Sequence, residues 1–208
     1  MATADERIDA LASERLAEVH GGEIALVGKD NPYFRAIRKS GAKSGITVVD
    51  GFRATMPVLV DAHSGKDYVL TEHNDIDHLV TEGLSCVAEA TMILLRSYGL
   101  VGKHVVIVGR GHAVKGLVKA LLAEDATVTV CHSKTRDLSS IMQDADMLVV
   151  AAPITERIYP LYTSVIVDIS GAYAKDEGRL QSVCEYTRHI GKLTVAVLLE
   201  RAARWRDK

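Results

Sequence analysis

The second half of the chain alternates short apolar runs with longer stretches of helical periodicity. Four strands are predicted there, at residues 104–108, 127–130, 147–150 and 165–167. The last two are continuously apolar, which is typical of strands buried on both faces of a sheet. Because helical stretches separate the strands, residues 104–170 are predicted to form βαβ units around a parallel sheet.

Helices are predicted between and around these strands. A helix is expected at 85–98, with Ser85 as its N-cap and Gly99 as its stop, because serine oxygens cap helix N-termini and glycine ends helices. Its apolar face comprises Cys86, Ala90, Ile93 and Leu94. Three more helices are predicted, at 113–124, 137–143 and 191–206, the last with Leu193, Val197 and Leu198 directed inward.

The first 80 residues predict a smaller α/β layer. Apolar residues near helical spacing predict an amphipathic helix at 5–19, through Ile8, Leu11, Leu16 and Val19. Strands are predicted at 23–27, 46–49 and 56–60. A helix between the first two begins near Pro32, since a proline early in a helix lacks only an N–H that would be unpaired there anyway.

Composition and charge narrow the class of protein. The 208 residues carry a formal net charge of −2, with 48% hydrophobic and 25% charged residues, so neither nucleic acid nor a membrane surface is an expected partner. No apolar run approaches the roughly 20 residues that span a bilayer. Cys86, Cys131 and Cys184 lack metal-ligand spacing, which predicts reduced thiols, no metal site and a cytoplasmic protein.

A glycine-rich turn follows the strand at 104–108 and precedes the next helix. Gly109 and Gly111 occupy the first two positions of a dinucleotide fingerprint, but its sixth position is Val114 and the third glycine comes late, at Gly116. Such a turn brings backbone N–H groups and a helix N-terminus to a phosphate. A purely structural turn is the alternative, and the strand–turn–helix context favours nucleotide binding over it.

The end of the second strand favours NADP over NAD. An NAD site usually places an acidic residue here to accept from the ribose hydroxyls. This chain instead has residues 131–136, Cys-His-Ser-Lys-Thr-Arg, and no acid until Asp137. Hydroxyls and cations attract a ribose phosphate, and Arg110 adds a further cation. The alternative is that Lys134 and Arg136 form only a solvated loop.

The turn and the strand that follows it resemble those of the methylenetetrahydrofolate dehydrogenase/cyclohydrolase family. The likeness covers roughly residues 85–204. It is carried by residues 105–110 with Val114, by 121–135 with the sequence TVTVCHSKT, by 145–151, by 167–169, and by LTVAVLLE at 193–200. The resemblance implies a folate-side α/β domain, a Rossmann domain that binds NAD(P), a cleft between them, and a homodimer.

The resemblance also implies the division of the chain and its cofactor residues. The expected parts are a shortened folate-side domain at 1–84, a Rossmann-like domain at 85–190 and a C-terminal helix at 191–208 that packs back on the first domain. The expected cofactor-binding residues are Gly109, Arg110, Gly111, His112, Val114, His132, Ser133, Lys134, Thr135, Ala152 and Pro153.

The folate side departs from the family pattern. The family pairs a tyrosine with a lysine one helical turn later, so that both lie on one helix face; here Tyr33 matches the tyrosine, but Ile37 occupies the lysine position. An isoleucine can neither polarise the folate nor activate water. The resemblance assigns Tyr33 to orienting the substrate and Asp77 to holding its pterin-like ring, while the alternatives are an ordinary helix residue and a helix cap.

These departures predict an NADP-dependent dehydrogenase acting on a folate-like small molecule, with cyclohydrolase activity weak or absent. Hydride transfer needs chiefly the orientation of two bound partners, whereas cyclohydrolysis needs proton transfer and activated water. Two alternatives stay open. One is an oxidoreductase with a rebuilt pocket for another small substrate, and the other is a nucleotide-binding or scaffold protein without catalysis.

Overall fold

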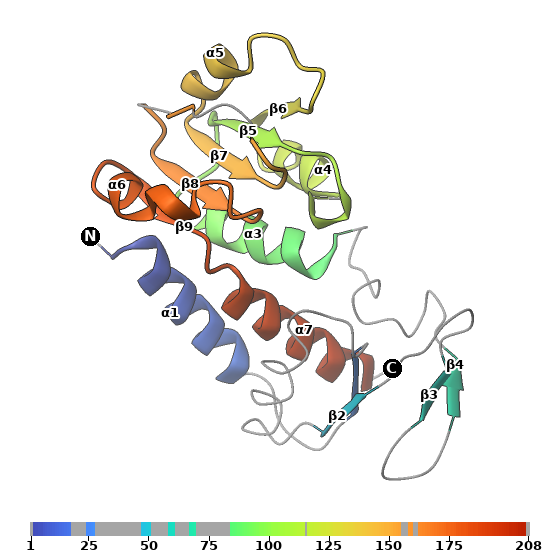
Figure 1. Cartoon of the computed structure of the whole chain (residues 1–208). Coiled ribbons are helices and arrows are strands. Elements are labelled where there is room, and N and C mark those ends of the chain that lie inside the picture. Colours follow the sequence, from blue (N-terminus) through green and yellow to red (C-terminus); the bar gives the residue numbers. More distant parts are fainter. Residues whose placement is uncertain are drawn as a thin grey trace.

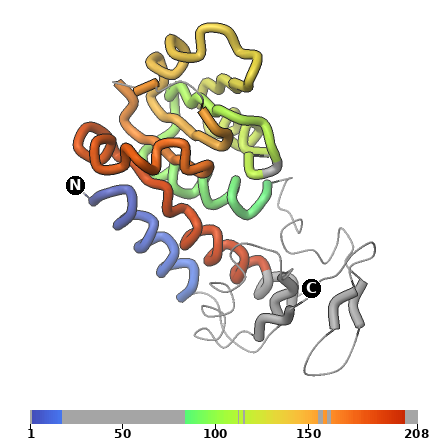
Figure 2. Tube along the Cα trace, in the orientation of Figure 1, coloured from blue at the N-terminus to red at the C-terminus, as the bar shows by residue number. Residues whose placement is uncertain are grey.

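The structure is a computed structural model of the chain. It describes residues 2–17, 24–27, 47–50, 58–60, 67–69, 84–114, 116–154, 158–159 and 162–206. Figure 2 traces the chain in the orientation of Figure 1.

A five-stranded, fully parallel sheet organises residues 104–187 (Figure 1). Its strands are β5 (His104–Val108), β6 (Thr127–Cys131), β7 (Met147–Val150), β8 (Val165–Asp168) and β9 (Glu185–Thr187). Their order across the sheet is β6-β5-β7-β8-β9, with all neighbours parallel. The four predicted strands are confirmed. Strand β9 was not predicted, because Glu-Tyr-Thr is too short and too polar to stand out as a buried strand.

Alternate residues of the central strands feed two separate cores. Val105 and Ile107 face a cluster that includes residues of helices α1 (Ala4–Ala17), α3 (Cys86–Arg96), α4 (Leu117–Leu122) and α7 (Gly191–Arg206). Val106 and Val108 face a second cluster, which includes Met142 and Leu180 of helix α6 (Glu177–Gln181). Because side chains alternate along a strand, each buried strand fills both faces of the sheet. The result is three layers, helix–sheet–helix, as the continuous apolar runs predicted.

Helix α3 (Cys86–Arg96) begins as predicted. The Ser85 hydroxyl accepts from the backbone N–H of Ala88 at 3.1 Å, and Gly99 follows the helix with a φ of +81°. Its burial is wider than the predicted face: eight of its eleven residues are buried. The helix is therefore enclosed by the sheet on one side and by other helices on the rest.

The helix predicted at 113–124 is wrong at its start. Residues His112–Val114 form a 3₁₀ turn, η1, and helix α4 extends only over Leu117–Leu122. Between them Gly116 has a φ of +81°, a left-handed conformation that interrupts a right-handed helix. Helix α5 (Leu138–Gln143) starts directly after Asp137, as predicted.

Two long helices lie side by side beneath the sheet (Figure 1). Helix α1 (Ala4–Ala17) packs against α7 (Gly191–Arg206), and α7 also contacts α3 and β1. Helix α7 is confirmed at its predicted bounds, but its buried set is larger than the predicted stripe and comprises Leu193, Thr194, Val195, Ala196, Val197, Leu198, Leu199, Glu200 and Arg201.

Ionic contacts accompany this packing. Lys192 Nζ lies 2.6 Å from Asp9, and Asp5 accepts from the Thr187 hydroxyl at 2.6 Å. At the far end of the pair, Arg15 contacts Glu200. These contacts join α1 to α7 and to β9, so α1 belongs to the same packed body as the sheet even though 182 residues separate Asp5 from Thr187.

The remaining elements complete the described part of the chain. Strands β1 (Ile24–Val27) and β2 (Thr47–Asp50) pair in parallel, and β3 (Val58–Val60) and β4 (Asp67–Val69) pair antiparallel. Strand β4 was not predicted. After β8 come η2 (Ala174–Asp176) and α6 (Glu177–Gln181). The helix predicted to begin near Pro32 lies outside the described residues. Within the described ranges, no helix is long and apolar enough to cross a membrane.

Candidate functional site

Gly109 forms the base of the glycine-rich turn at the carboxyl end of β5. It has a φ of +117°, and a Cβ built on it would lie 3.0 Å from the carbonyl carbon of Ala151 and 3.2 Å from the Cβ of Ala152. Its N–H donates to the carbonyl of Cys131 at 2.8 Å. Only glycine combines this φ with this close approach. The turn is thereby held tightly against the end of the neighbouring strand β7.

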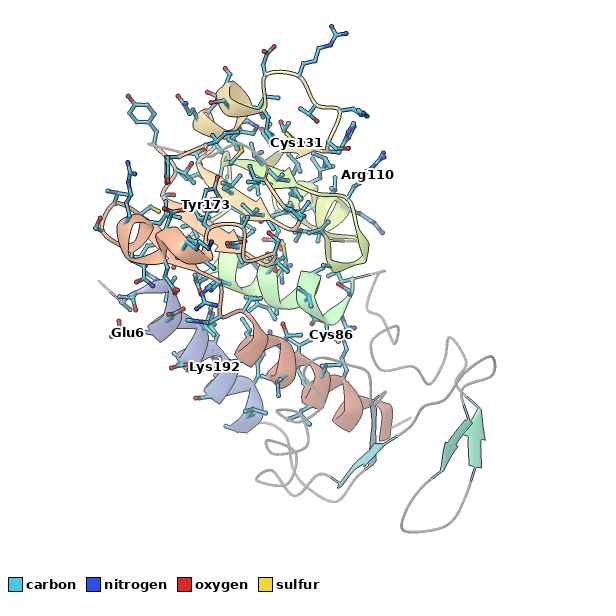
Figure 3. All side chains as sticks on the ribbon, in the orientation of Figure 1. Glu6, Cys86, Arg110, Cys131, Tyr173 and Lys192 are labelled. Carbon is cyan, nitrogen blue, oxygen red and sulfur yellow. The ribbon has the colours of Figure 1, made fainter. Side chains whose placement is uncertain are left out.

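The first residues after Gly109 are exposed to solvent, whereas the end of the turn is buried in the core. Arg110 and Gly111 are exposed, and Figure 3 shows Arg110 at the outer edge of the sheet layer. Val114 is buried in the core that includes α3 and α4, with its N–H donating to the carbonyl of Gly111 at 3.2 Å. The Ser85 hydroxyl donates to the carbonyl of Ala113 at 3.3 Å. The N-terminus of α3 thus holds the 3₁₀ turn in place.

A cleft of about 740 Å³ opens beside this turn. It lies between the loop that follows β6 and the segment that follows β7, outside the carboxyl ends of the strands. In open α/β sheets ligands bind at this edge, where the strand order reverses. The lining residues are Val108, His132, Ser133, Thr135, Asp137, Leu138, Ser139, Ala152, Pro153 and Ile154.

Hydrogen bonds shape the loop after β6 into a defined turn. The Thr135 hydroxyl accepts from the His132 N–H at 2.8 Å, and the Thr135 N–H donates to the His132 carbonyl at 2.8 Å. The Lys134 N–H donates to Nδ1 of His132 at 3.1 Å. The side chain of His132 thus takes part in the turn as the acceptor of this last bond. The loop presents Ser133 and Lys134 to solvent.

Asp137 also lines the cleft, which the sequence argument for NADP did not expect. Its φ of 53° and ψ of 38° are left-handed, and its side chain makes no capping bond to α5. A non-glycine residue in this conformation is uncommon, although aspartate tolerates it better than most. The carboxylate adds negative charge to a loop that also carries the exposed cations Lys134 and Arg136.

A buried carboxylate stands at the end of β8, next to the cleft wall. Asp168 is 1% exposed and accepts from the N–H groups of Ala172 and Tyr173 at 3.0 and 2.8 Å, and from the Tyr186 hydroxyl at 3.1 Å. Burial, followed by the charge of Asp168, raises the pKa of both Tyr173 and Tyr186 above the usual value. Both phenols therefore remain protonated donors at neutral pH.

The predicted cofactor residues come together in part. Five of them line the cleft, namely His132, Ser133, Thr135, Ala152 and Pro153. Gly109 directly follows Val108, which also lines the cleft. Lys134 is exposed in the loop that lines the cleft, and Val114 is in the core.

Sequence reasoning missed five lining residues, namely Val108, Asp137, Leu138, Ser139 and Ile154. The available signal was that Val108 ends the predicted strand at 104–108 and that the other four follow the predicted strands at 127–130 and 147–150 along the chain. Tyr33, Ile37 and Asp77 lie outside the described residues. Among those that are described, no three His, Cys, Asp or Glu residues are grouped to hold a metal.

Fold and cleft together define a Rossmann-like, dinucleotide-binding class of α/β protein. The model of the tetrahydrofolate dehydrogenase/cyclohydrolase NAD(P)-binding domain matches residues 85–187. The chain belongs to this family through that domain.

Curated relatives support the assignment. The bifunctional protein FolD of Thermosipho melanesiensis is 39% identical over 140 residues, covering 59% of this chain and 51% of the relative. FolD of Desulforamulus reducens is 39% identical over 125 residues, covering 51% of this chain and 43% of the relative. The chain thus spans about half the length of the curated relatives that it matches.

Solved structures show the same fold at lower identity. The Campylobacter jejuni FolD, a methylenetetrahydrofolate dehydrogenase/cyclohydrolase, superposes with a TM-score of 0.65 at 19% identity, covering 98% of this chain and 94% of that one. The Trypanosoma brucei FolD complexed with NADP and an inhibitor has a TM-score of 0.66 at 18% identity, with coverage of 100% and 97%.

Proposed function

We propose that the chain binds NADP, and NAD less tightly, in the cleft at the carboxyl ends of β5, β6 and β7. The observation that carries the proposal is the cleft itself, which joins His132, Ser133 and Thr135 to Ala152 and Pro153 within the domain matched as NAD(P)-binding. The residues fit a dinucleotide: Gly109 lets the turn after β5 pack closely against Ala151 at the cleft edge, and hydroxyls with nearby cations suit a ribose phosphate.

The proposed reaction is the oxidation of methylenetetrahydrofolate to methenyltetrahydrofolate. The methylene carbon of the folate would lose a hydride, for which NADP⁺ held in the cleft would supply the acceptor. The protein contributes orientation and exclusion of water more than acid–base chemistry. Ser133, Thr135 and Lys134 would hold the ribose phosphate, with Arg110 as a further cation. Orientation alone accounts for hydride transfer without a catalytic lysine.

Cyclohydrolase activity is proposed to be weak or absent. Under the family likeness Tyr33 orients the folate and Asp77 holds its ring, but Ile37 stands where the family has lysine. Isoleucine supplies no proton and polarises no leaving group. The two activities of the family would therefore be uncoupled in this chain.

Titration of the full chain with NADP and NAD by calorimetry tests the cofactor. We expect NADP to bind more tightly, and a Lys134→Gln/Arg136→Gln variant to lose most of that preference. A Lys119→Gln/Lys175→Gln variant, which removes two other exposed cations, is the matched control and should keep it. Equal or tighter binding of NAD by the wild-type chain contradicts the proposed preference.

A spectrophotometric assay of methylenetetrahydrofolate with NADP tests the substrate. Formation of NADPH supports the dehydrogenase. Cofactor binding without NADPH formation favours a rebuilt pocket for another substrate, and absence of binding favours a scaffold. We also propose a cytoplasmic homodimer, which light scattering of the purified chain checks for mass and fractionation of the source cells checks for location.

A further inference from the structure

One wall of the cleft is a short segment after β7 that carries no regular secondary structure. Ala152, Pro153 and Ile154 line the cleft there. The backbone groups of a segment outside helices and strands lack a regular ladder of partners, so other groups of the protein or solvent must satisfy them. Two of its carbonyls have such partners, and both partners come from the segment after β8.

The first attachment holds the beginning of the wall. The Ser170 hydroxyl lies 3.2 Å from the carbonyl oxygen of Ala152 and 3.1 Å from a carboxylate oxygen of Asp168. A hydroxyl has one proton, so it is shared between these two acceptors. The N–H groups of Ile169 and Ser170 also donate to the Val150 carbonyl, at 2.8 and 3.1 Å. The residues after β8 are thus bound to the end of β7 at several points.

The second attachment holds the chain at Ile158, four residues beyond the last wall residue, Ile154. The Tyr173 hydroxyl donates to the carbonyl of Ile158 at 2.5 Å, and both side chains are buried, at 4% and 5% exposure. The next residue, Tyr159, donates to Asp176 at 3.1 Å, and the guanidinium of Arg179 lies 4.2 Å from the centre of its ring. Figure 3 shows Tyr173 beside α6. The wall is therefore fastened on both sides of Pro153 and Ile154.

Asp168 organises both attachments. Its carboxylate accepts from the Ser170 hydroxyl and from the N–H of Tyr173, so it sets where both tethering residues lie. We propose that Ser170 and Tyr173, both bound to Asp168, are positioning residues that hold the 152–154 wall of the cleft and so set the affinity for the dinucleotide. This inference rests on the proposed function.

Paired tyrosine variants of the full chain separate positioning from bulk stability. Tyr173→Phe removes the bond to the Ile158 carbonyl, which holds the wall. Tyr186→Phe removes an equally buried hydroxyl whose bond to Asp168 comes from β9 and reaches no wall residue. Both should lower the unfolding midpoint to a similar extent, because each removes one buried hydrogen bond.

Only Tyr173→Phe should weaken NADP binding, by about fivefold, the equivalent of about 1 kcal/mol for one hydrogen bond. Ser170→Ala should act in the same direction. Its control, Ser164→Ala, removes a hydroxyl that donates to the backbone carbonyl of Asp146 at the opposite end of the sheet. This variant should leave NADP binding within twofold of the wild type. In the dehydrogenase assay the KM for NADP should rise while kcat stays within twofold.

The outcomes distinguish the two claims. A wild-type chain that binds NADP, with Tyr173→Phe and Tyr186→Phe binding it equally well, overturns the positioning role alone. A wild-type chain that binds neither NADP nor NAD overturns the proposed function and this inference together. Faster amide hydrogen exchange at 152–154 in Tyr173→Phe but not in Tyr186→Phe, measured without ligand, would support the tether directly.

Discussion

Gly109 approaches Ala151 so closely that a Cβ on the glycine would lie 3.0 Å from the carbonyl carbon of Ala151. The contact joins the turn after β5 to the end of β7, and neither partner is a side chain that can move aside. Gly109→Ala should therefore destabilise the chain by about 1–3 kcal/mol, since an L-residue is strained at this φ. It should also abolish NADP binding. Urea unfolding and calorimetry check the two effects.

Gly178→Ala is the matched control for that variant. Gly178 lies in α6, and a Cβ added to it would meet no other atom within 4 Å. Alanine is also favoured over glycine in helices by about 1 kcal/mol. The variant should be neutral or stabilising and leave binding intact. An equal loss in both variants would contradict the role given to the Gly109–Ala151 approach.

Removing the charge of Asp137 should strengthen NADP binding. The carboxylate lines the cleft near the predicted phosphate site, and a charge repulsion of about 1 kcal/mol across a solvated rim corresponds to about fivefold. Asp137→Asn keeps a residue that tolerates the left-handed backbone. Calorimetry should show tighter NADP binding and NAD binding that is unchanged or weaker.

Asp125→Asn provides the comparison. Asp125 has a similarly left-handed φ of 58° and is exposed, but it precedes β6 at the amino end of the sheet. It should leave both affinities unchanged. If Asp137→Asn weakens NADP binding instead, Asp137 contributes a favourable contact and the repulsion argument is wrong.

Asp146 should contribute stability that depends on pH. The N–H of His104 donates to its carboxylate at 2.9 Å, and this bond, together with the nearby charge of Lys103, lowers the pKa of Asp146. A carboxyl whose folded pKa lies below its unfolded value of about 3.9 stabilises the fold above that value. The stability is lost as the pH falls through the lower, folded pKa.

Urea unfolding at a series of pH values checks this. Asp146→Asn should be less stable than the wild type at pH 7, with the difference shrinking below about pH 4. Asp144→Asn is the control, because that side chain is 85% exposed and its contact with His104 Nδ1, at 3.5 Å, is screened by solvent. A difference for Asp146→Asn that stays constant down to about pH 2 would rule out the charge as its cause.

Ile37→Lys should raise cyclohydrolase activity if the folate pocket differs from the family only at this residue. The lysine would supply the cation and proton donor that isoleucine lacks. Conversion of methenyltetrahydrofolate, followed by its absorbance, measures the gain, and Ile37→Leu serves as the uncharged control. No gain over Ile37→Leu would indicate that the pocket has changed at more positions.

Local patterns in the sequence were sufficient for most elements of the sheet domain. The apolar runs at 147–150 and 165–167 identified strands that the structure buries on both faces, and Ser85 identified the start of α3. These predictions succeeded because burial on both faces and capping leave their mark within a few neighbouring residues. The same holds for α7, which has its predicted bounds.

Other features depend on residues far apart in the chain. The turn at 109–116 indicated a nucleotide site, but the break at Gly116, the placing of Asp137 on the cleft and the tethers from Ser170 and Tyr173 to the wall after β7 required the folded chain. A φ at one glycine, or a carbonyl paired with a hydroxyl 15 residues away, leaves no periodic trace in the sequence. Such contacts form only when the ends of parallel strands meet at one edge of the sheet.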